Sequence, residues 1–191
     1  VMAATVDIET WTGGSAGSPN KTQAADFRYR TDDSPTTKDR TNPLVLPSSG
    51  QNYSFWQHTA LAISGTFDEV SNIRFFTDGS IDWSLGTNGQ VQRGAQDTGD
   101  QGCPEASYEP ATGTTGETGD DLAANHSYFS GQTTPTTNVE NDTSGSPATI
   151  DSNTYTASTS TKAVVTQAVV DGDATSGVQA DETMTFRYDE I

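Results

Sequence analysis

The side chains that most often carry catalysis or metal binding are scarce in this chain: two histidines, His58 and His126, and one cysteine, Cys103. The three lie far apart in the sequence and match neither H-x-x-x-H nor C-x-x-C, spacings that bring metal ligands together. His58 lies in an aromatic-rich stretch, where a structural histidine is a more common role than a catalytic base. We therefore predict no metal site and no cofactor at these residues.

Carboxylates are the second group of candidates, because paired acids can hydrolyse glycosides or bind Ca²⁺. The segment 171–177 (DGDATSG) would be the best cation loop, although a β-turn is the simpler interpretation. With 26 Asp and Glu residues in the chain, close pairs are expected from composition alone. No pair matches the EF-hand or another specific pattern, so we predict no catalytic residue, no metal ligand and no enzymatic activity. The pairs are Asp32/Asp33, Asp97/Asp100, Asp120/Asp121 and Asp171/Asp173.

The chain is strongly acidic, because 26 Asp and Glu residues against 9 Lys and Arg residues give a formal net charge of -17. A nucleic-acid-binding protein would carry a basic cluster, and the sequence has none, so we expect no nucleic-acid partner. The acidic residues are spread along the chain, as in a solvated surface. Surplus acid with few lysines suits hydration in concentrated salt and favours a halophilic source; an ordinary acidic mesophilic protein is the alternative.

Hydrophobic residues make up 31% of the chain and are concentrated between residues 53 and 84. Apolar and polar residues alternate in 5–10 (TVDIET), 26–30 (DFRYR) and 182–190 (ETMTFRYDE), the pattern of half-buried strands. Residues 162–171 (KAVVTQAVVD) are a further strand candidate, although a short helix also fits their spacing. These patterns predict an all-β fold, a jelly-roll-like β-sandwich with long polar loops or arms rich in Gly, Ser and Thr.

Within this sandwich we expect the strands at 53–64 and 70–77 to lie adjacent. Residues 12–20 (TGGSAGSPN) are expected to form a loop, because Gly, Ser, Pro and Asn follow in close succession. The expected core residues are Phe55, Leu61, Ile63, Ile73, Phe75, Phe186 and Tyr188.

Composition divides the chain into N-terminal strands or an arm (1–41), a sandwich core (42–86 and 162–191) and a long polar insertion (86–161). A structureless loop of this length is unusual in a self-sufficient domain. Ordering one residue's backbone costs about 1–2 kcal/mol, whereas full burial of one large apolar side chain returns about 1.5–3 kcal/mol. Because the insertion has few large apolar residues, we expect contacts with other chains to order it.

The first residues, VMAATVDIETW, lack the basic and apolar regions of a signal peptide, and no apolar run is long enough to span a membrane. A single cysteine excludes an internal disulfide. These features favour synthesis and assembly in the cytoplasm and predict no membrane partner.

Two segments, 52–79 (NYSFWQHTALAISGTFDEVSNIRFFTDG) and 182–191 (ETMTFRYDEI), resemble a module of small structural proteins in tailed virus particles. The resemblance covers roughly residues 42–86 and 162–191. It implies a non-enzymatic virion component, either a capsid decoration or turret or a tail part, from a virus of halophilic archaea. The implied partners are major capsid or tail proteins and further copies of the chain. The implied location is the virion, assembled in the host cytoplasm and released by lysis.

Two other functions stay open. A secreted or cell-surface β-sandwich could bind Ca²⁺ through carboxylates or glycans through Trp11, Trp56 and Trp83, although packing is the default role for Trp56 and Trp83. An acid-dependent hydrolase is the third candidate, and the lack of an organised set of catalytic residues disfavours it.

The salt dependence of stability tests the halophilic interpretation. If repulsion between surface carboxylates destabilises the protein, its melting temperature should rise between about 0.1 M and 2 M KCl, since the Debye length shrinks to about 3 Å at 1 M. Scanning calorimetry on the purified protein measures this change. A melting temperature that stays constant or falls over the same range would contradict a halophilic origin.

Overall fold

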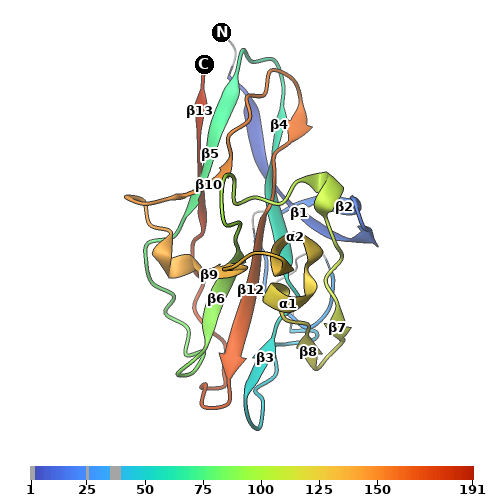
Figure 1. The fold of residues 1–191 in the computed structure, drawn as a ribbon, viewed down its shortest axis with the longest axis vertical. Helices are drawn as coiled ribbons and strands as arrows, with labels where there is room; N and C mark the ends of the chain where they lie inside the picture. The colour runs from blue at the N-terminus through green and yellow to red at the C-terminus, as the bar shows by residue number, and fades with distance from the viewer. Residues whose placement is uncertain (1–2, 25, 35–39) are drawn as a thin grey trace.

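The computed structural model describes residues 3–24, 26–34 and 40–191. The chain is mostly β-structure, with 41% strand and 8% helix. Its two main antiparallel sheets pack together in an elongated body (Figure 1). The expected all-β, sandwich-like fold is confirmed.

The larger sheet has the strand order β2-β1-β4-β12-β6-β9, with β11 also paired to β4 and β3 to β12. β12 is central and pairs with β4, β6 and β3. Nearly all of β12 is buried, which accounts for the Val and Ala residues that make up most of the strand. The segment is therefore a strand and not a helix. The bounds are β1 Thr5–Ser15, β2 Ser18–Gln23, β3 Gln51–Tyr53, β4 Gln57–Ser64, β6 Gln90–Gly94, β9 Thr136–Asn138, β11 Thr159–Ser160 and β12 Val164–Asp171.

The smaller sheet has the order β10-β5-β13, so that β13, near the end of the chain, forms one edge. The alternating pattern at 5–10 is confirmed as part of β1. The pattern at 182–190 is confirmed for residues 185–190, which form β13. A two-stranded hairpin and short helical turns complete the described structure. The bounds are β5 Val70–Phe76, β10 Ala148–Asp151, β13 Thr185–Glu190, β7 Gly113–Thr114, β8 Thr118–Gly119, α1 Leu122–Asn125, α2 Ser127–Ser130, η1 Glu105–Ser107 and η2 Val139–Asn141.

The main core fills the space between the two sheets and contains most of the residues expected there. Those from β4 and β5 are at most 2% exposed, and those from β13 pack half-buried against them. Phe55 is buried too, but in a second cluster that includes residues of the short helices. The residues of the main core that the sequence predicted are Leu61, Ile63, Ile73, Phe75, Phe186 and Tyr188.

The expected pairing of the strands at 53–64 and 70–77 is wrong. β4 pairs with β1, β11 and β12, whereas β5 pairs with β10 and β13. The chain therefore crosses from one sheet to the other between these strands. Their apolar sides meet face to face across the core, an arrangement that covers both of them.

Two shorter segments also differ from expectation. Residues 26–30 form no strand, and Arg30 takes part in an isolated β-bridge with Pro43. Residues 12–20 are a hairpin rather than a loop, because β1 extends to Ser15 and β2 begins at Ser18. Gly17, with φ 70°, supplies the left-handed backbone that this tight turn needs.

Residues 86–161, expected to be ordered by other chains, pack on the rest of this chain. β6 lies between β12 and β9 in the larger sheet, and β10 extends the smaller one. Hydrogen bonds from polar side chains to the loop backbone add to apolar burial in this segment, so its small number of apolar residues does not imply ordering by partners. Six large side chains of the segment are at most 1% exposed: Val91, Tyr108, Leu122, Phe129, Val139 and Ile150.

Replacing Phe75 tests the face-to-face core. Phe75 is 2% exposed and contacts the Phe186 ring edge-on, with centroids 5.7 Å apart. Phe75→Ala should therefore lower the free energy of unfolding by about 3–5 kcal/mol, because it leaves a cavity between the sheets. Denaturant unfolding measures the loss. Val178→Ala, at a side chain 82% exposed, is the control and should change stability by less than about 0.5 kcal/mol. Equal small effects of both substitutions would contradict the core assignment.

Candidate functional site: a buried His–Cys–His cluster

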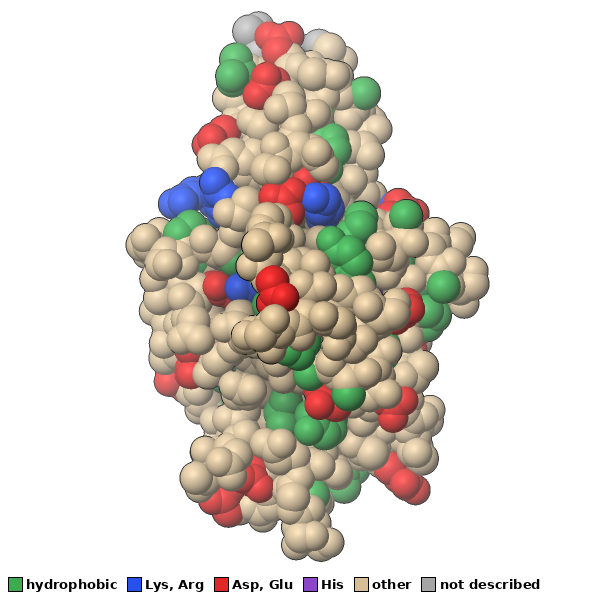
Figure 2. All heavy atoms as spheres, in the orientation of Figure 1, with side chains coloured by type: hydrophobic (Ala, Val, Ile, Leu, Met, Phe, Trp, Pro, Cys, Tyr) green, Lys and Arg blue, Asp and Glu red, His purple; other side chains and the backbone are tan. Residues whose placement is uncertain are grey.

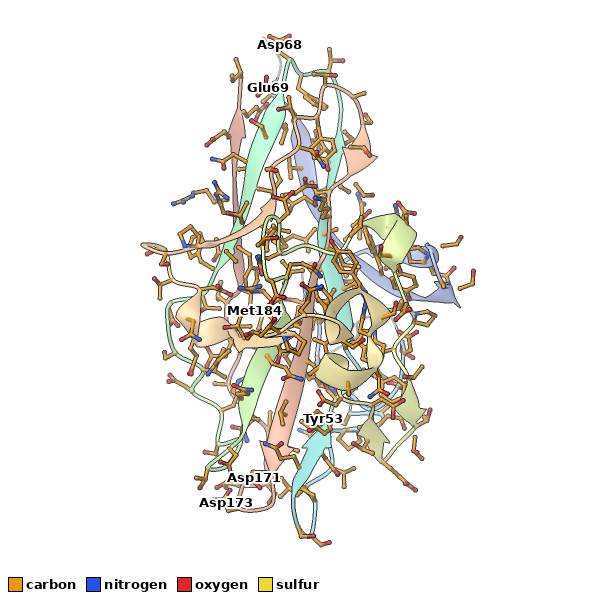
Figure 3. The ribbon with its side chains drawn as sticks, in the orientation of Figure 1. Tyr53, Asp68, Glu69, Asp171, Asp173 and Met184 are labelled. Carbon is orange, nitrogen blue, oxygen red and sulfur yellow. The ribbon has the colours of Figure 1, made fainter. Side chains whose placement is uncertain are left out.

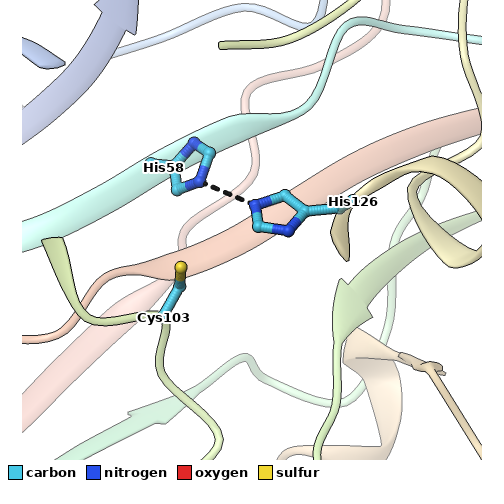
Figure 4. A group of neighbouring side chains, drawn as sticks. All are labelled: His58, Cys103 and His126. Atoms are coloured by element: carbon cyan, nitrogen blue, oxygen red, sulfur yellow. Dashed lines mark hydrogen bonds between the residues drawn. The ribbon is translucent and has the colours of Figure 1, made fainter. Parts of the chain in front are cut away.

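The two histidines and the single cysteine, which are far apart in the sequence, meet in the interior. The ligand atoms of His58, Cys103 and His126 all lie within 4.8 Å of one another (Figure 4). The Nε2 atoms of the two imidazoles are 3.2 Å apart, a hydrogen-bond distance. Sequence spacing gave no sign of this group, because each residue comes from a different part of the fold.

Backbone pairing fixes each member of the cluster. His58 is the second residue of β4, opposite Trp11 of β1 and Val165 of β12. The backbone N–H and carbonyl of Cys103 both bond to Ala163, just before β12, at 2.8 and 2.9 Å.

His126 lies between the two one-turn helices α1 and α2. Its N–H donates to the Leu122 carbonyl, and its own carbonyl accepts from the N–H of Phe129 and of Ser130. Both ends of this junction are therefore hydrogen-bonded, which sets the direction of the imidazole.

Aromatic rings surround the cluster and exclude water. Trp11 stacks on His58 with ring centroids 6.2 Å apart, and the Tyr108 ring lies 4.7 Å from the same imidazole. Trp56 and Phe129 flank His126, at 5.5 and 4.9 Å.

Burial controls the charge of the three groups. Desolvation, and to a smaller extent the neighbouring His126 imidazole, lowers the pKa of His58 well below its usual value. Desolvation lowers the pKa of His126 to about 4, against an opposing effect of Glu109. Desolvation raises the pKa of the Cys103 thiol, and Glu109 adds to the shift. Without a bound ion, the cluster therefore holds two neutral imidazoles and a protonated thiol at neutral pH.

Glu109 forms an outer layer of the cluster. One of its carboxylate oxygens lies 3.7 Å from Nδ1 of His126, a buried nitrogen without a hydrogen-bond partner. The N–H of Ser127 donates to the same oxygen at 2.8 Å, and the Trp56 indole N–H donates to the Glu109 carbonyl. The carboxylate is thus held beside the imidazole.

The chemistry of the cluster follows from its burial and its donor atoms. A protonated thiol without solvent contact is a poor nucleophile, since the thiolate is the reactive form. Two imidazole nitrogens and one sulfur are, however, the donors that zinc and copper prefer. These three side chains could hold such an ion.

The paired carboxylates do not form an open cation loop. Asp171 accepts hydrogen bonds from the Asn88 backbone and side chain, and Asp173 accepts from the Thr87 N–H. These bonds lower the pKa of both carboxyls. Figure 3 shows Asp171 and Asp173 together at one end of the molecule, opposite Asp68. The pair holds the turn at residues 86–89 in place.

The other carboxylate pairs have similar roles. Each has at least one member that bonds to backbone N–H groups or to a basic side chain, so the pairs are engaged as structural contacts. The contacts are Asp97 with Thr133 and Thr134, Asp100 with Ser152 and Lys162, Asp32 with Arg30, Asp33 with Gly13, and Asp121 with Ala123.

The three tryptophans do not share one surface. Trp11 and Trp56 are 1% and 2% exposed. Trp83 is half-buried, its ring contacts Tyr29 edge-on, and its indole N–H donates to the Ala180 carbonyl. Two of the three rings are therefore closed to a glycan.

Comparison of the chain with protein-family models, with curated proteins and with solved structures finds no match. In the described part of the chain, no helix has the length and apolar character that crossing a membrane requires.

Proposed function

We propose that the protein is a non-enzymatic structural component of a tailed virus particle, assembling on major capsid or tail proteins and on further copies of itself. The observation that carries the proposal is the pairing of the two segments that resemble such proteins. From residues 42–86 come β3, β4 and β5, and from 162–191 come β12 and β13. β4 and β3 pair with β12, and β5 pairs with β13. Segments distant in the sequence thus make one contiguous part of the sandwich.

The β13 edge is the part of this unit that suits assembly. β13 pairs with β5 on one side, and no other described strand pairs with it. A free strand edge can accept a strand from another chain through backbone hydrogen bonds. The nearby Ile191 is 69% exposed and adds an apolar contact point. We assign this edge to the contact with a neighbouring virion protein.

The acidic surface fits a particle exposed to concentrated salt. On the face in Figure 2, Asp and Glu side chains are distributed from end to end, whereas Lys and Arg occupy a few places. Hydration of such carboxylates keeps copies soluble in concentrated salt, where their mutual repulsion is screened. This distribution supports the halophilic source.

A self-contained cell-surface or secreted binding domain is the second candidate. The observation that favours it is the packing of residues 86–161 on their own chain, through strands of both main sheets. A domain that orders itself needs no particle to hold it.

Particle fractionation separates the two candidates. Tailed virus particles from lysed cultures that carry this gene should contain the protein at a fixed ratio to the capsid or tail protein after gradient centrifugation. Particles made without the gene should bind the purified protein when it is added, since the folded chain already presents the β13 edge. An unrelated acidic protein of similar size and charge controls for adsorption. Recovery only in the particle-free or cell-surface fraction would refute the virion role and support the binding domain.

A further inference from the structure

We propose that His58, Cys103 and His126 bind one copper ion in a three-coordinate centre. The chain contains one Cys and two His residues in all. The fold brings every one of them to the same buried point. Two imidazoles and one thiolate in a trigonal arrangement are typical of copper sites in proteins. The proposal is independent of the virion role.

The distances fit a single ion. Metal–imidazole bonds of about 2.0–2.1 Å would meet between the two Nε2 atoms, which are 3.2 Å apart, at an angle of about 100°. The Cys103 sulfur lies within 4.8 Å of a nitrogen of each imidazole. A metal–sulfur bond of about 2.3 Å therefore requires the sulfur to move inward, through a rotation of the side chain.

The carboxylate of Glu109 also supports a metal ion at this cluster. A metal on Nε2 of His126 places the remaining proton on Nδ1, the buried nitrogen without a hydrogen-bond partner. Glu109 lies 3.7 Å from that nitrogen and is anchored by Ser127. Carboxylates in this position orient metal-binding histidines and increase their basicity. A bound ion thus gives a role to a polar group that the metal-free cluster leaves unsatisfied.

Copper is favoured over zinc by the number of ligands. No fourth His, Cys, Asp or Glu of the described chain joins the group, whereas structural zinc sites are almost always four-coordinate. The aromatic rings of Trp11, Trp56 and Phe129 pack against the two imidazoles, which disfavours a water molecule as fourth ligand. Copper accepts a trigonal His₂Cys arrangement.

Binding would fasten residues 86–161 to the larger sheet, because two ligands belong to that segment and His58 belongs to β4. The ion replaces the thiol proton, so that a Cu–S bond forms and one proton leaves to solvent. An open hollow of about 350 Å³, lined by Tyr108, Glu109 and Ser127 among others, lies over the outer carboxylate.

Copper loading of the full chain tests the proposal. Protein stripped by a chelator is refolded without oxygen with one equivalent of Cu²⁺ and then desalted. We expect one copper per chain by elemental analysis, with the visible absorption of a thiolate–Cu²⁺ bond. Cys103→Ser and His126→Gln should abolish both signals. Glu109→Gln, which leaves all three ligands in place, should weaken binding by about 10–100-fold.

Asp68→Asn is the matched control for adventitious binding, since it removes an exposed carboxylate distant from the cluster and should leave copper retention unchanged. Circular dichroism of the metal-free variants verifies that they fold. If a ligand variant fails to fold, the weaker copper binding expected for Glu109→Gln still tests the proposal. Retention of no copper by the wild type, or equal retention by Cys103→Ser, would overturn the proposal. Retention of zinc in preference to copper would overturn the identity of the ion.

Discussion

Hydrogen bonds from polar side chains to loop backbone are the interaction on which the rest of the structure depends. With 31% hydrophobic residues, the chain has too few apolar side chains to fix its loops by burial alone. Carboxylates and amides supply the missing contacts: Asp97 receives backbone N–H groups of residues 133–134, and Gln167 of β12 receives the N–H of Leu122. Each bond satisfies a backbone donor that folding would otherwise leave unpaired.

Buried polar contacts also join these loops to the sheets. Arg93 of β6 makes a two-pronged ion pair with Asp142, at 2.6 and 3.0 Å, next to the η2 turn. The Gln167 amide donates to the carbonyls of Ser54 and Asp120. A partly satisfied network of this kind would destabilise the interior, so its completeness specifies one arrangement. That arrangement is what brings the loops of Cys103 and His126 to β4.

Local patterns were sufficient to predict the sandwich but not its connections. Alternation at 5–10 and 182–190 reports which side of a strand is covered, and this needs no knowledge of the partner strand. The pairing of β4 and β5 was wrong because alternation does not say which sheet a strand joins. The hairpin at 12–20 was missed since glycines that suit a loop also suit a tight turn. The cluster of His58, Cys103 and His126 rests on contacts between distant segments, for which the sequence offers no spacing signal.

Hydrogen exchange in the isolated monomer is the most direct test of the central claim, that this polar chain orders its own loops. We expect strong protection of the amides in β6, at Cys103 and in the α1–α2 turn, close to that of β12, because each is hydrogen-bonded within the chain. Exchange of these amides at the rate of an unstructured chain, while β4 and β12 stay protected, would contradict it.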